Sequence, residues 1–244
     1  MLIKYWDHRY SMGHMALFSI GRLLYYVRKI DEATARVLLN RTEKTHAEKI
    51  LASSDLGAIG WLFHHVSVIE EATARDLFNR TKKTYAKKII ASTDPMAIGW
   101  LLNSVRKMEE KTARDLFNRT KKTYAKKIIA STDPMAIGWL LNSVRKMEEK
   151  TARFLLNKTK KTYAKKIIAS TDPEAIGRLL DSVREIKEGT ARVLLSEIQD
   201  TIAEKIKAST SPELIKSLLD SISKIDNKTA KRLKKETKFK SEEK

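Results

Sequence analysis

The sequence predicts an all-α fold, a right-handed α-solenoid of six 39-residue helical repeats with two to three helices each. The four prolines of the chain stand 39 residues apart, at Pro95, Pro134, Pro173 and Pro212. Five of the eight glycines keep the same step, at Gly21, Gly60, Gly99, Gly138 and Gly177. A fixed period of about 20–50 residues is typical of solenoids and other repeat arrays. No stretch alternates apolar and polar residues as a strand would.

The repeats divide the chain into one helical domain with short ends. Six copies span residues 6–44, 45–83, 84–122, 123–161, 162–200 and 201–239, so we expect a single helical-repeat domain over 16–239. Residues 1–13 match the repeat poorly, and residues 1–15 are expected to be an N-terminal cap or, around Gly13-His14-Met15, a remnant of cloning. Residues 240–244 are expected to be a disordered tail. The third and fourth copies agree at 36 of 39 positions, which indicates recent tandem duplication or deliberate engineering.

Each copy opens with an amphipathic helix. In the third copy, Asp94 can cap the free N–H groups of the helix, and Pro95 is tolerated in its first turn. An apolar stripe follows at Ile98, Leu101, Leu102 and Val105, which is the spacing of one helix face. The first three of these slots are apolar in all six copies, so we predict that they form the buried core.

The second half of each copy carries one or two further helices. A second apolar stripe lies at Ala113, Leu116, Phe117 and Thr120. A third, shorter helix is predicted around Ala86, Ile89 and Ile90, and the pairs Thr45/Glu48 and Thr201/Glu204 have capping-box spacing at its start. The apolar residues of the two stripes would lie on nearly the same side of one continuous helix. The two predicted helices can therefore equally be one long helix.

Neighbouring repeats must cover each other's apolar faces, because a 39-residue helical unit cannot hide its own. A glycine inside a helix costs about 1 kcal/mol relative to alanine. The glycine in each first helix therefore predicts a close approach between helices. The last copy has Lys216 in this slot, and it carries Arg232, Lys234 and Lys235 where the third copy has Asp115, Phe117 and Asn118. These changes predict a polar C-terminal capping repeat.

These repeats resemble the α-solenoid families, namely HEAT, armadillo and tetratricopeptide repeats. The 39-residue step is closer to HEAT than to the 34 residues of tetratricopeptides, whose signature is missing. The phrase AIGWLL at residues 97–102, followed by Thr112-Ala113-Arg114, is also weakly similar to helical repeats attached to prokaryotic signalling ATPases of the STAND class. The resemblance covers residues 16–239 and implies a ligand-binding scaffold or sensor region without chemistry of its own. No Walker loop is present, so an ATPase would be a separate chain or domain.

Composition excludes some classes of protein and favours others. Lys+Arg 49 against Asp+Glu 30 gives a formal net charge of +19, which predicts nucleic acid, an anionic membrane surface or an acidic protein as partner. No window has the roughly 18 consecutive apolar residues of a membrane span. The first fifteen residues lack the apolar core of a signal peptide. The chain has no cysteine, which excludes disulfides and thiolate sites and fits a cytoplasmic location.

The side of each first helix opposite the core changes its chemistry from copy to copy. The slot of Trp100 holds, in chain order, Arg22, Trp61, Trp100, Trp139, Arg178 and Ser217. Three residues on, the slot holds Tyr25, His64, Asn103, Asn142, Asp181 and Asp220. One interpretation is a recognition surface whose indoles stack on bases or bury peptide side chains. The alternative is that the Trp rings pack between repeats and that Arg in the same slot extends to water.

Basic residues also recur in register. The candidates for phosphate contact are Lys87, Lys88, Lys126, Lys127, Lys165, Lys166, Arg106 and Arg145. Packed helices lie about 8–10 Å apart, so these residues would form rows of basic side chains along the array, called the lysine lines below. Such rows could contact successive phosphates of a nucleic acid. The alternative is a solvated helix face. A further arginine follows Thr-Ala in five copies, and we expect it to pair with an acid four residues earlier, as Arg114 with Glu110.

The sequence shows no constellation of catalytic residues. His64 and His65 are adjacent, so they point about 100° apart on a helix, and no carboxylate stands beside them at metal-ligand spacing. HExxH, GxSxG and Gly-rich phosphate loops are missing. A HEAT-like alkyl-purine DNA glycosylase resembles the chain in length, repeat number and basic surface, but such enzymes place specialised residues in diverged repeats. We therefore expect no enzyme activity, no metal and no cofactor.

Three functional hypotheses follow. In the first and favoured one, the protein is a non-enzymatic scaffold that binds nucleic acid, with phosphates on the lysine lines and bases on the Trp stripe. In the second, it binds an acidic protein or peptide in its groove. In the third, it is an engineered or self-assembling repeat array without a ligand. The discriminating feature is whether the Trp stripe and the lysine pairs face the same groove.

Overall fold

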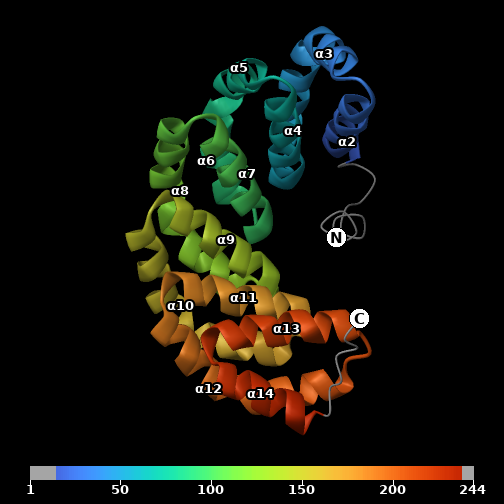
Figure 1. The fold of residues 1–244 in the computed structure, drawn as a ribbon. Helices are drawn as coiled ribbons and strands as arrows, with labels where there is room; N and C mark the ends of the chain where they lie inside the picture. The colour runs from blue at the N-terminus through green and yellow to red at the C-terminus, as the bar shows by residue number, and fades with distance from the viewer. Residues whose placement is uncertain (1–14, 238–244) are drawn as a thin grey trace. The chain divides into compact units, whose positions relative to one another are not determined.

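The computed structural model describes residues 15–237, and every regular element in this part of the chain is helical (Figure 1). The elements are α2 (Met15–Ile30), α3 (Glu32–Ala52), α4 (Leu56–Ile69), α5 (Glu71–Thr81), the 3₁₀ turn η2 (Lys82–Thr84), α6 (Tyr85–Ala91), α7 (Pro95–Met108), α8 (Glu110–Ala130), α9 (Pro134–Met147), α10 (Glu149–Ala169), α11 (Pro173–Ile186), α12 (Glu188–Ala208), α13 (Pro212–Ile225) and α14 (Asn227–Glu236). The prediction of an all-α solenoid is confirmed. Its handedness stays a prediction.

Three repeats, α7–α8, α9–α10 and α11–α12, are each a pair of helices, a first helix of 14 residues and a second helix of 21 residues. Asp133 caps α9 by accepting hydrogen bonds from the N–H groups of Met135 and Ala136, and Pro134 follows in the first turn. A single extended residue, Glu148, then joins the two helices, because it ends α9 and precedes α10. The chain reverses direction at this one residue.

The second half of the repeat is the single long helix that the sequence left open as an alternative. The separate third helix with a capping box is wrong for α3 and α12, because Thr45 and Thr201 lie inside these helices. The buried face continues through this point, with Leu39 before Thr45 and Ile50 after it. Among the described residues, only α5 and α6 depart from this pattern, since η2 separates them. The short helix predicted around Ala86, Ile89 and Ile90 is present there as α6.

The described residues form two compact units, residues 15–92 with 100–121 and residues 93–99 with 122–237. In the second unit, α9, α11 and α13 pack side by side as one layer, and α10 and α12 pack against them as a second layer. The first helices contact one another more extensively than the second helices do. In the first unit, α2 packs along α4, and α3 packs along α5.

The predicted core is buried except in the first copy, where Leu23, in the slot of Leu101, is 53% exposed and Ile20, in the slot of Ile98, is half-buried. Ile98, Leu101, Leu102 and Val105 are fully buried, and so are Ala113, Phe117 and Thr120. The prediction that Ile90 belongs to the apolar stripe is wrong, since this residue is 52% exposed while Ile89 is buried. Tyr85 and Ile89 are four residues apart and occupy the core face, so Ile90 points about 100° away from it.

The glycine in the first helix marks a close approach between helices, as predicted. A Cβ on Gly60 would lie 3.0 Å from the backbone N of Leu101 and 3.2 Å from its Cα. Ser104 reinforces this contact, because its Oγ donates to the carbonyl of Gly60 at 2.9 Å. In the last copy the equivalent Lys216 is exposed, which agrees with a repeat that needs no such contact.

The ends of the array are partly described. In α14, Ala230 and Leu233 are buried while Lys231, Arg232 and Lys234 are exposed, as expected for a polar capping repeat. The predicted N-terminal cap or cloning remnant (1–15, apart from Met15) and the tail (240–244) lie outside the described residues. Within 15–237, no helix combines the length and apolar character that crossing a membrane requires.

Candidate functional site

The residues predicted to lie opposite the core occupy the surface of the first helices. We call this surface the first-helix face; its members in the described chain are Arg22, Tyr25, Trp61, His64, Trp100, Asn103, Trp139, Asn142, Arg178, Asp181, Ser217 and Asp220. Arg22, Ser217 and Asp220 are exposed and the others are half-buried. The face therefore leaves part of every side chain exposed to solvent.

In the first unit, the tryptophans of the first-helix face pack between neighbouring first helices. The ring of Trp61 stacks on Phe18, with centroids 5.5 Å apart and an interplanar angle of 27°. Its other neighbours are His65, at 4.6 Å between ring centroids, and Trp100, at 5.9 Å. These indoles thus contribute to packing between repeats and remain half-exposed, and the interpretation as a recognition surface stays a prediction.

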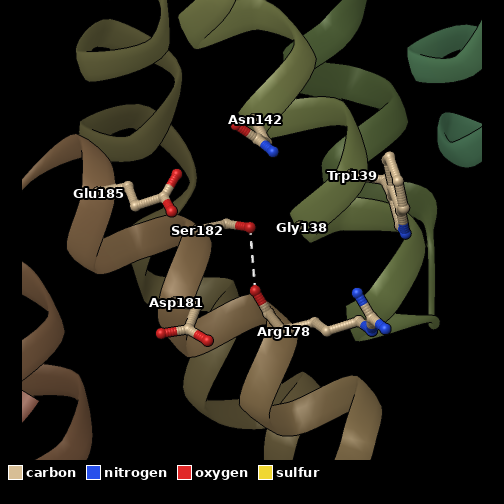
Figure 2. A pocket seen from close by; sticks show the side chains of 7 residues that line it. All are labelled: Gly138, Trp139, Asn142, Arg178, Asp181, Ser182 and Glu185. Atoms are coloured by element: carbon tan, nitrogen blue, oxygen red, sulfur yellow. Dashed lines mark hydrogen bonds between the residues drawn. The ribbon is translucent and has the colours of Figure 1, made fainter. Parts of the chain in front are cut away.

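In the second unit, the first-helix face contains a pocket between α9 and α11 (Figure 2). Its volume is about 210 Å³, and it is lined by Gly138, Trp139, Asn142, Arg178, Asp181, Ser182 and Glu185. Figure 2 shows the indole of Trp139 and the guanidinium of Arg178 on one side and the carboxylate of Glu185 on the other. The structure therefore brings three of the predicted site residues, Trp139, Asn142 and Arg178, into one pocket.

Charged groups at the pocket are arranged in pairs. Arg178 donates from Nε and Nη2 to Oε1 of Glu174, at 3.0 and 2.8 Å. Glu185 accepts a hydrogen bond from Nη2 of Arg145 at 2.6 Å. Arg145, a candidate for phosphate contact, therefore pairs with a carboxylate of the next first helix. The other candidate of this slot, Arg106, is half-buried.

Asp181 contacts polar groups of α11 and α13. Its Oδ2 accepts a hydrogen bond from the hydroxyl of Ser221 at 2.9 Å and lies 3.7 Å from Nζ of Lys224. Its Oδ1 is buried without a hydrogen-bond donor among the described residues, and the nearest cationic atom is Nε of Arg184 at 3.6 Å. One acceptor of this carboxylate is thus left unsatisfied.

The two members of each lysine pair have different environments. Lys166 donates from Nζ to the carbonyl of Ile129 at 2.9 Å and also to the carbonyl of Ser131. Lys88 makes the equivalent bonds to Leu51, at 2.9 Å, and to Ser53. Burial lowers the pKa of Lys88, Lys127 and Lys166. Their partners Lys87, Lys126 and Lys165 are exposed. The exposed member of each pair is the one that a partner can reach.

The lysine pairs and the Trp slot lie on opposite outer faces of the repeat. In α9, Trp139 follows the buried Ile137 by two residues, and in α10, Lys165 follows the buried Tyr163 by two residues. Two residues correspond to about 200° around a helix, so both side chains point away from the core. Since α9 and α10 pack against each other, Trp139 and Lys165 face opposite sides.

The arginines that follow Thr-Ala pair within their own helix, as predicted. Nη2 of Arg114 lies 2.6 Å from Oε1 of Glu110. The same i,i+4 pair occurs at Arg36–Glu32, Arg75–Glu71, Arg153–Glu149 and Arg192–Glu188, between 2.5 and 2.8 Å. These pairs are exposed and contribute only a few tenths of a kcal/mol each.

Sequence reasoning missed two residues of the pocket, Ser182 and Glu185. Glu185 stands in the slot that holds Lys107 and Lys146 in the two preceding copies. The change from a basic to an acidic residue at this position was the signal in the sequence that could have identified Glu185. No group of three or more His, Cys, Asp or Glu that could hold a metal occurs within residues 15–237.

Comparison with protein-family models, with curated proteins and with solved structures found no match to this chain.

Proposed function

We propose that the chain is a non-enzymatic binding scaffold that holds a segment of a protein partner on the first-helix face. The observation that carries the proposal is the pocket between α9 and α11, where an indole, an amide, a guanidinium and two carboxylates surround a single recess. Protein–protein interfaces concentrate their binding energy in a few such anchors, with Trp and Arg among the most frequent.

The variation between copies supports the same function. The core slots repeat from copy to copy, whereas the Trp slot of the first-helix face changes from Arg22 to Trp61, and from Trp139 to Arg178 and Ser217, in successive repeats. A scaffold that only stacks on itself has no need of this variation. Resemblance to the α-solenoid families and to STAND-associated repeats also suits a ligand-binding region. The net charge of +19 favours a partner with net negative charge, and the cysteine-free composition suits a cytoplasmic one.

Nucleic-acid binding is the second candidate, favoured by the charge of the second helices. α10 carries seven basic residues and one acidic residue, and Lys161 and Lys165 are exposed on it. Phosphates would contact this second-helix face. The Trp slot lies on the opposite side, so one strand would not place its phosphates on Lys165 and its bases on Trp139 at the same time.

Selection of peptides from a displayed random library on the full chain tests the first candidate. We expect micromolar binders whose affinity falls at least tenfold in Trp139→Leu, which keeps an apolar side chain and removes the indole. The matched control is Lys165→Ala on the second-helix face, which is expected to leave the affinity unchanged. Failure to select binders, or equal losses in both variants, would overturn the proposal.

Fluorescence anisotropy with labelled single-stranded DNA and RNA tests the second candidate. Binding to about six phosphates predicts a slope near −4 for log K against log salt. Lys126→Ala and Lys165→Ala should weaken this binding, while Trp139→Leu should not. Absence of binding at about 50 mM salt would remove the candidate.

A further inference from the structure

The outer surfaces of α10 and α12 carry opposite charges at equivalent positions. In each helix, five exposed positions with the spacing i, i+4, i+7, i+11 and i+14 lie on the side opposite the buried face. In α10 they hold Phe154, Lys158, Lys161, Lys165 and Ile168, and in α12 they hold Val193, Glu197, Asp200, Glu204 and Lys207. We call the three lysines of α10 the basic stripe and the three acids of α12 the acidic stripe.

The two stripes lie side by side on one surface. α10 packs against α12 within the second unit (Figure 1). The two helices run in the same direction, because each follows a first helix after a reversal of the chain at one residue. Lys205 of α12 reaches the carbonyls of Ile168 and Ser170 at the end of α10, and its slot is that of Lys166. Equivalent positions therefore lie at similar levels along the two helices.

The charges of the two stripes are not neutralised inside the chain. The ion pairs within these helices lie outside the stripes, at Arg153–Glu149 and Arg192–Glu188. Among the described residues, the members of the stripes form no ion pair with one another or with a third group. Like charges one turn apart, such as Asp200 and Glu204, repel each other and destabilise a helix. A group of opposite charge placed over either stripe would relieve this repulsion.

Apolar side chains stand at the same end of both stripes. Phe154 is 61% exposed and Val193 is 59% exposed. The ammonium group of Lys158 lies 5.7 Å from the centroid of the Phe154 ring, so it covers only part of that side chain. The equivalent slot holds Asp76 and Asp115 in the second and third copies. The apolar pair is thus a particular property of α10 and α12 and not a requirement of the repeat.

We infer that a second copy of this chain binds to this surface, with the basic stripe of each copy on the acidic stripe of the other. A two-fold axis parallel to the helices and between them would place α10 of one copy over α12 of the other, and the reverse. Such an axis permits no shift along its own direction, so equivalent positions meet. The contacts, each made twice, are Lys158 with Glu197, Lys161 with Asp200, Lys165 with Glu204 and Phe154 with Val193.

Other occupants fit this surface less well. A two-fold axis perpendicular to the helices would place each stripe on its own counterpart, so that lysines face lysines. A nucleic acid would meet Lys161 and Lys165, but the acidic stripe beside them would repel its phosphates. An uncharged partner would bury the six charges of the stripes without partners. A second copy is the occupant that satisfies both stripes at once.

The dimer leaves the first-helix face free, because Trp139 and Lys165 face opposite sides of the repeat. Two helices offer less surface than the roughly 800 Å² per partner of a standard interface, so we expect a weak dimer. At about 0.15 M salt the Debye length is about 8 Å. The repulsion between the net charges of two copies is then largely screened, whereas charges in contact across the interface still attract each other.

Sedimentation equilibrium of the full chain at about 0.15 M salt, after nuclease treatment, tests the inference. We expect a monomer–dimer equilibrium with a Kd on the order of 10–100 µM, weaker than that of standard interfaces. A monomer at all concentrations up to about 500 µM, roughly five times the upper end of this range, would overturn the inference. Association that disappears on nuclease treatment would also overturn it, and would assign the basic stripe to nucleic acid.

Reversal of single charges identifies the contacts. Lys161→Glu and Asp200→Lys each bring like charges together twice in the dimer, so each variant should associate at least tenfold more weakly than the wild type. In an equimolar mixture of the two variants, both contacts again join opposite charges, so the mixture should dimerise as the wild type does. Lys228→Glu makes the same change in net charge at an exposed residue of α14 and should leave the Kd unchanged. Wild-type association of Lys161→Glu alone, or a mixture that stays monomeric, would overturn the inference.

Discussion

The ammonium group of Lys166 closes the C-terminal end of α8, 37 residues earlier in the chain, by donating to the carbonyl of Ile129 at 2.9 Å. The last carbonyls of an α-helix have no partner inside the helix. Lys205 makes the equivalent bonds to Ile168 at 2.8 Å and to Ser170 at 2.5 Å. Each long helix in these copies therefore receives its C-terminal cap from the next repeat, which couples neighbouring repeats through one side chain.

Replacing Lys166 by methionine should lower the free energy of unfolding by about 1–3 kcal/mol, because the carbonyls of Ile129 and Ser131 lose their donor while the packing of the side chain is kept. Urea denaturation measures the change. Lys165→Met is the matched control, since its side chain is exposed, and it should alter stability by no more than about 0.5 kcal/mol. Equal effects of the two substitutions would contradict the capping role of Lys166.

A buried hydroxyl pair in α10 gives a second prediction. The hydroxyls of Thr159 and Tyr163 are hydrogen-bonded, and Oγ1 of Thr159 also donates to the carbonyl of Leu155 at 2.7 Å. Burial raises the pKa of Tyr163, so its phenol is neutral and donates to Thr159. Thr159→Val leaves this phenol without its partner and should cost about 1–3 kcal/mol.

Tyr163→Phe removes the other half of the pair and should cost less, about 0.5–1.5 kcal/mol, because Thr159 keeps its bond to Leu155. Urea midpoints for the two variants, with unchanged slopes, measure the difference. A larger loss in Tyr163→Phe than in Thr159→Val would show that the phenol has another essential partner.

Much of the fold could be predicted from the spacing of residues along the chain. The positions of proline and of the Ile98–Val105 stripe depend on the local geometry of one helix, which the sequence shows directly. What could not be predicted depends on neighbouring repeats. Residues 73–91 and 112–130 have the same sequence, yet the first contains the 3₁₀ turn Lys82–Thr84 and the second lies within the single helix α8. Identical local sequences in two different conformations show that tertiary packing selects between them.

The candidate site was predictable in part. The Trp139 and Arg178 slots were identified by helical phase, which is a local property. The different roles of Lys165 and Lys166 were not, because adjacent residues point about 100° apart and only the packed structure shows which one reaches Ser131. Glu185 was missed because its significance depends on Trp139, which faces it from another repeat.

Acidification should destabilise the first unit through His65. This side chain is 6% exposed and packs against Trp61 and Tyr25. Burial, with the charges of His64 and Arg28, lowers the pKa of His65 from 6.5 to about 4. The folded state favours the neutral ring, so its contribution is complete above pH 6.5 and is lost as the pH falls toward 4. The loss in free energy of unfolding reaches about 3 kcal/mol at the end of this window.

Urea denaturation between pH 7 and pH 4.5, in wild type and in His65→Ser, isolates this contribution. Serine is the residue of the same slot in the next copy, Ser104, so the substitution suits the fold. The pKa values of His46 and His64 are also lowered by burial, so the variant should keep part of the pH dependence. The same acid-induced loss in both proteins would exclude His65 as a source.

The glycine slot of the first helices gives the last prediction. A Cβ on Gly60 would lie 3.0 Å from the backbone N of Leu101, and backbone atoms cannot move aside as a side-chain end can. Gly60→Ala should therefore destabilise the protein by about 1–3 kcal/mol, although alanine is the better helix former by about 1 kcal/mol. Gly189, in the first turn of α12, has no atom within 4 Å of the same position. Gly189→Ala should stabilise by about 0.4–1 kcal/mol. Thermal or urea unfolding of the two variants should thus give changes of opposite sign, and stabilisation by both would show that neighbouring first helices can separate without loss.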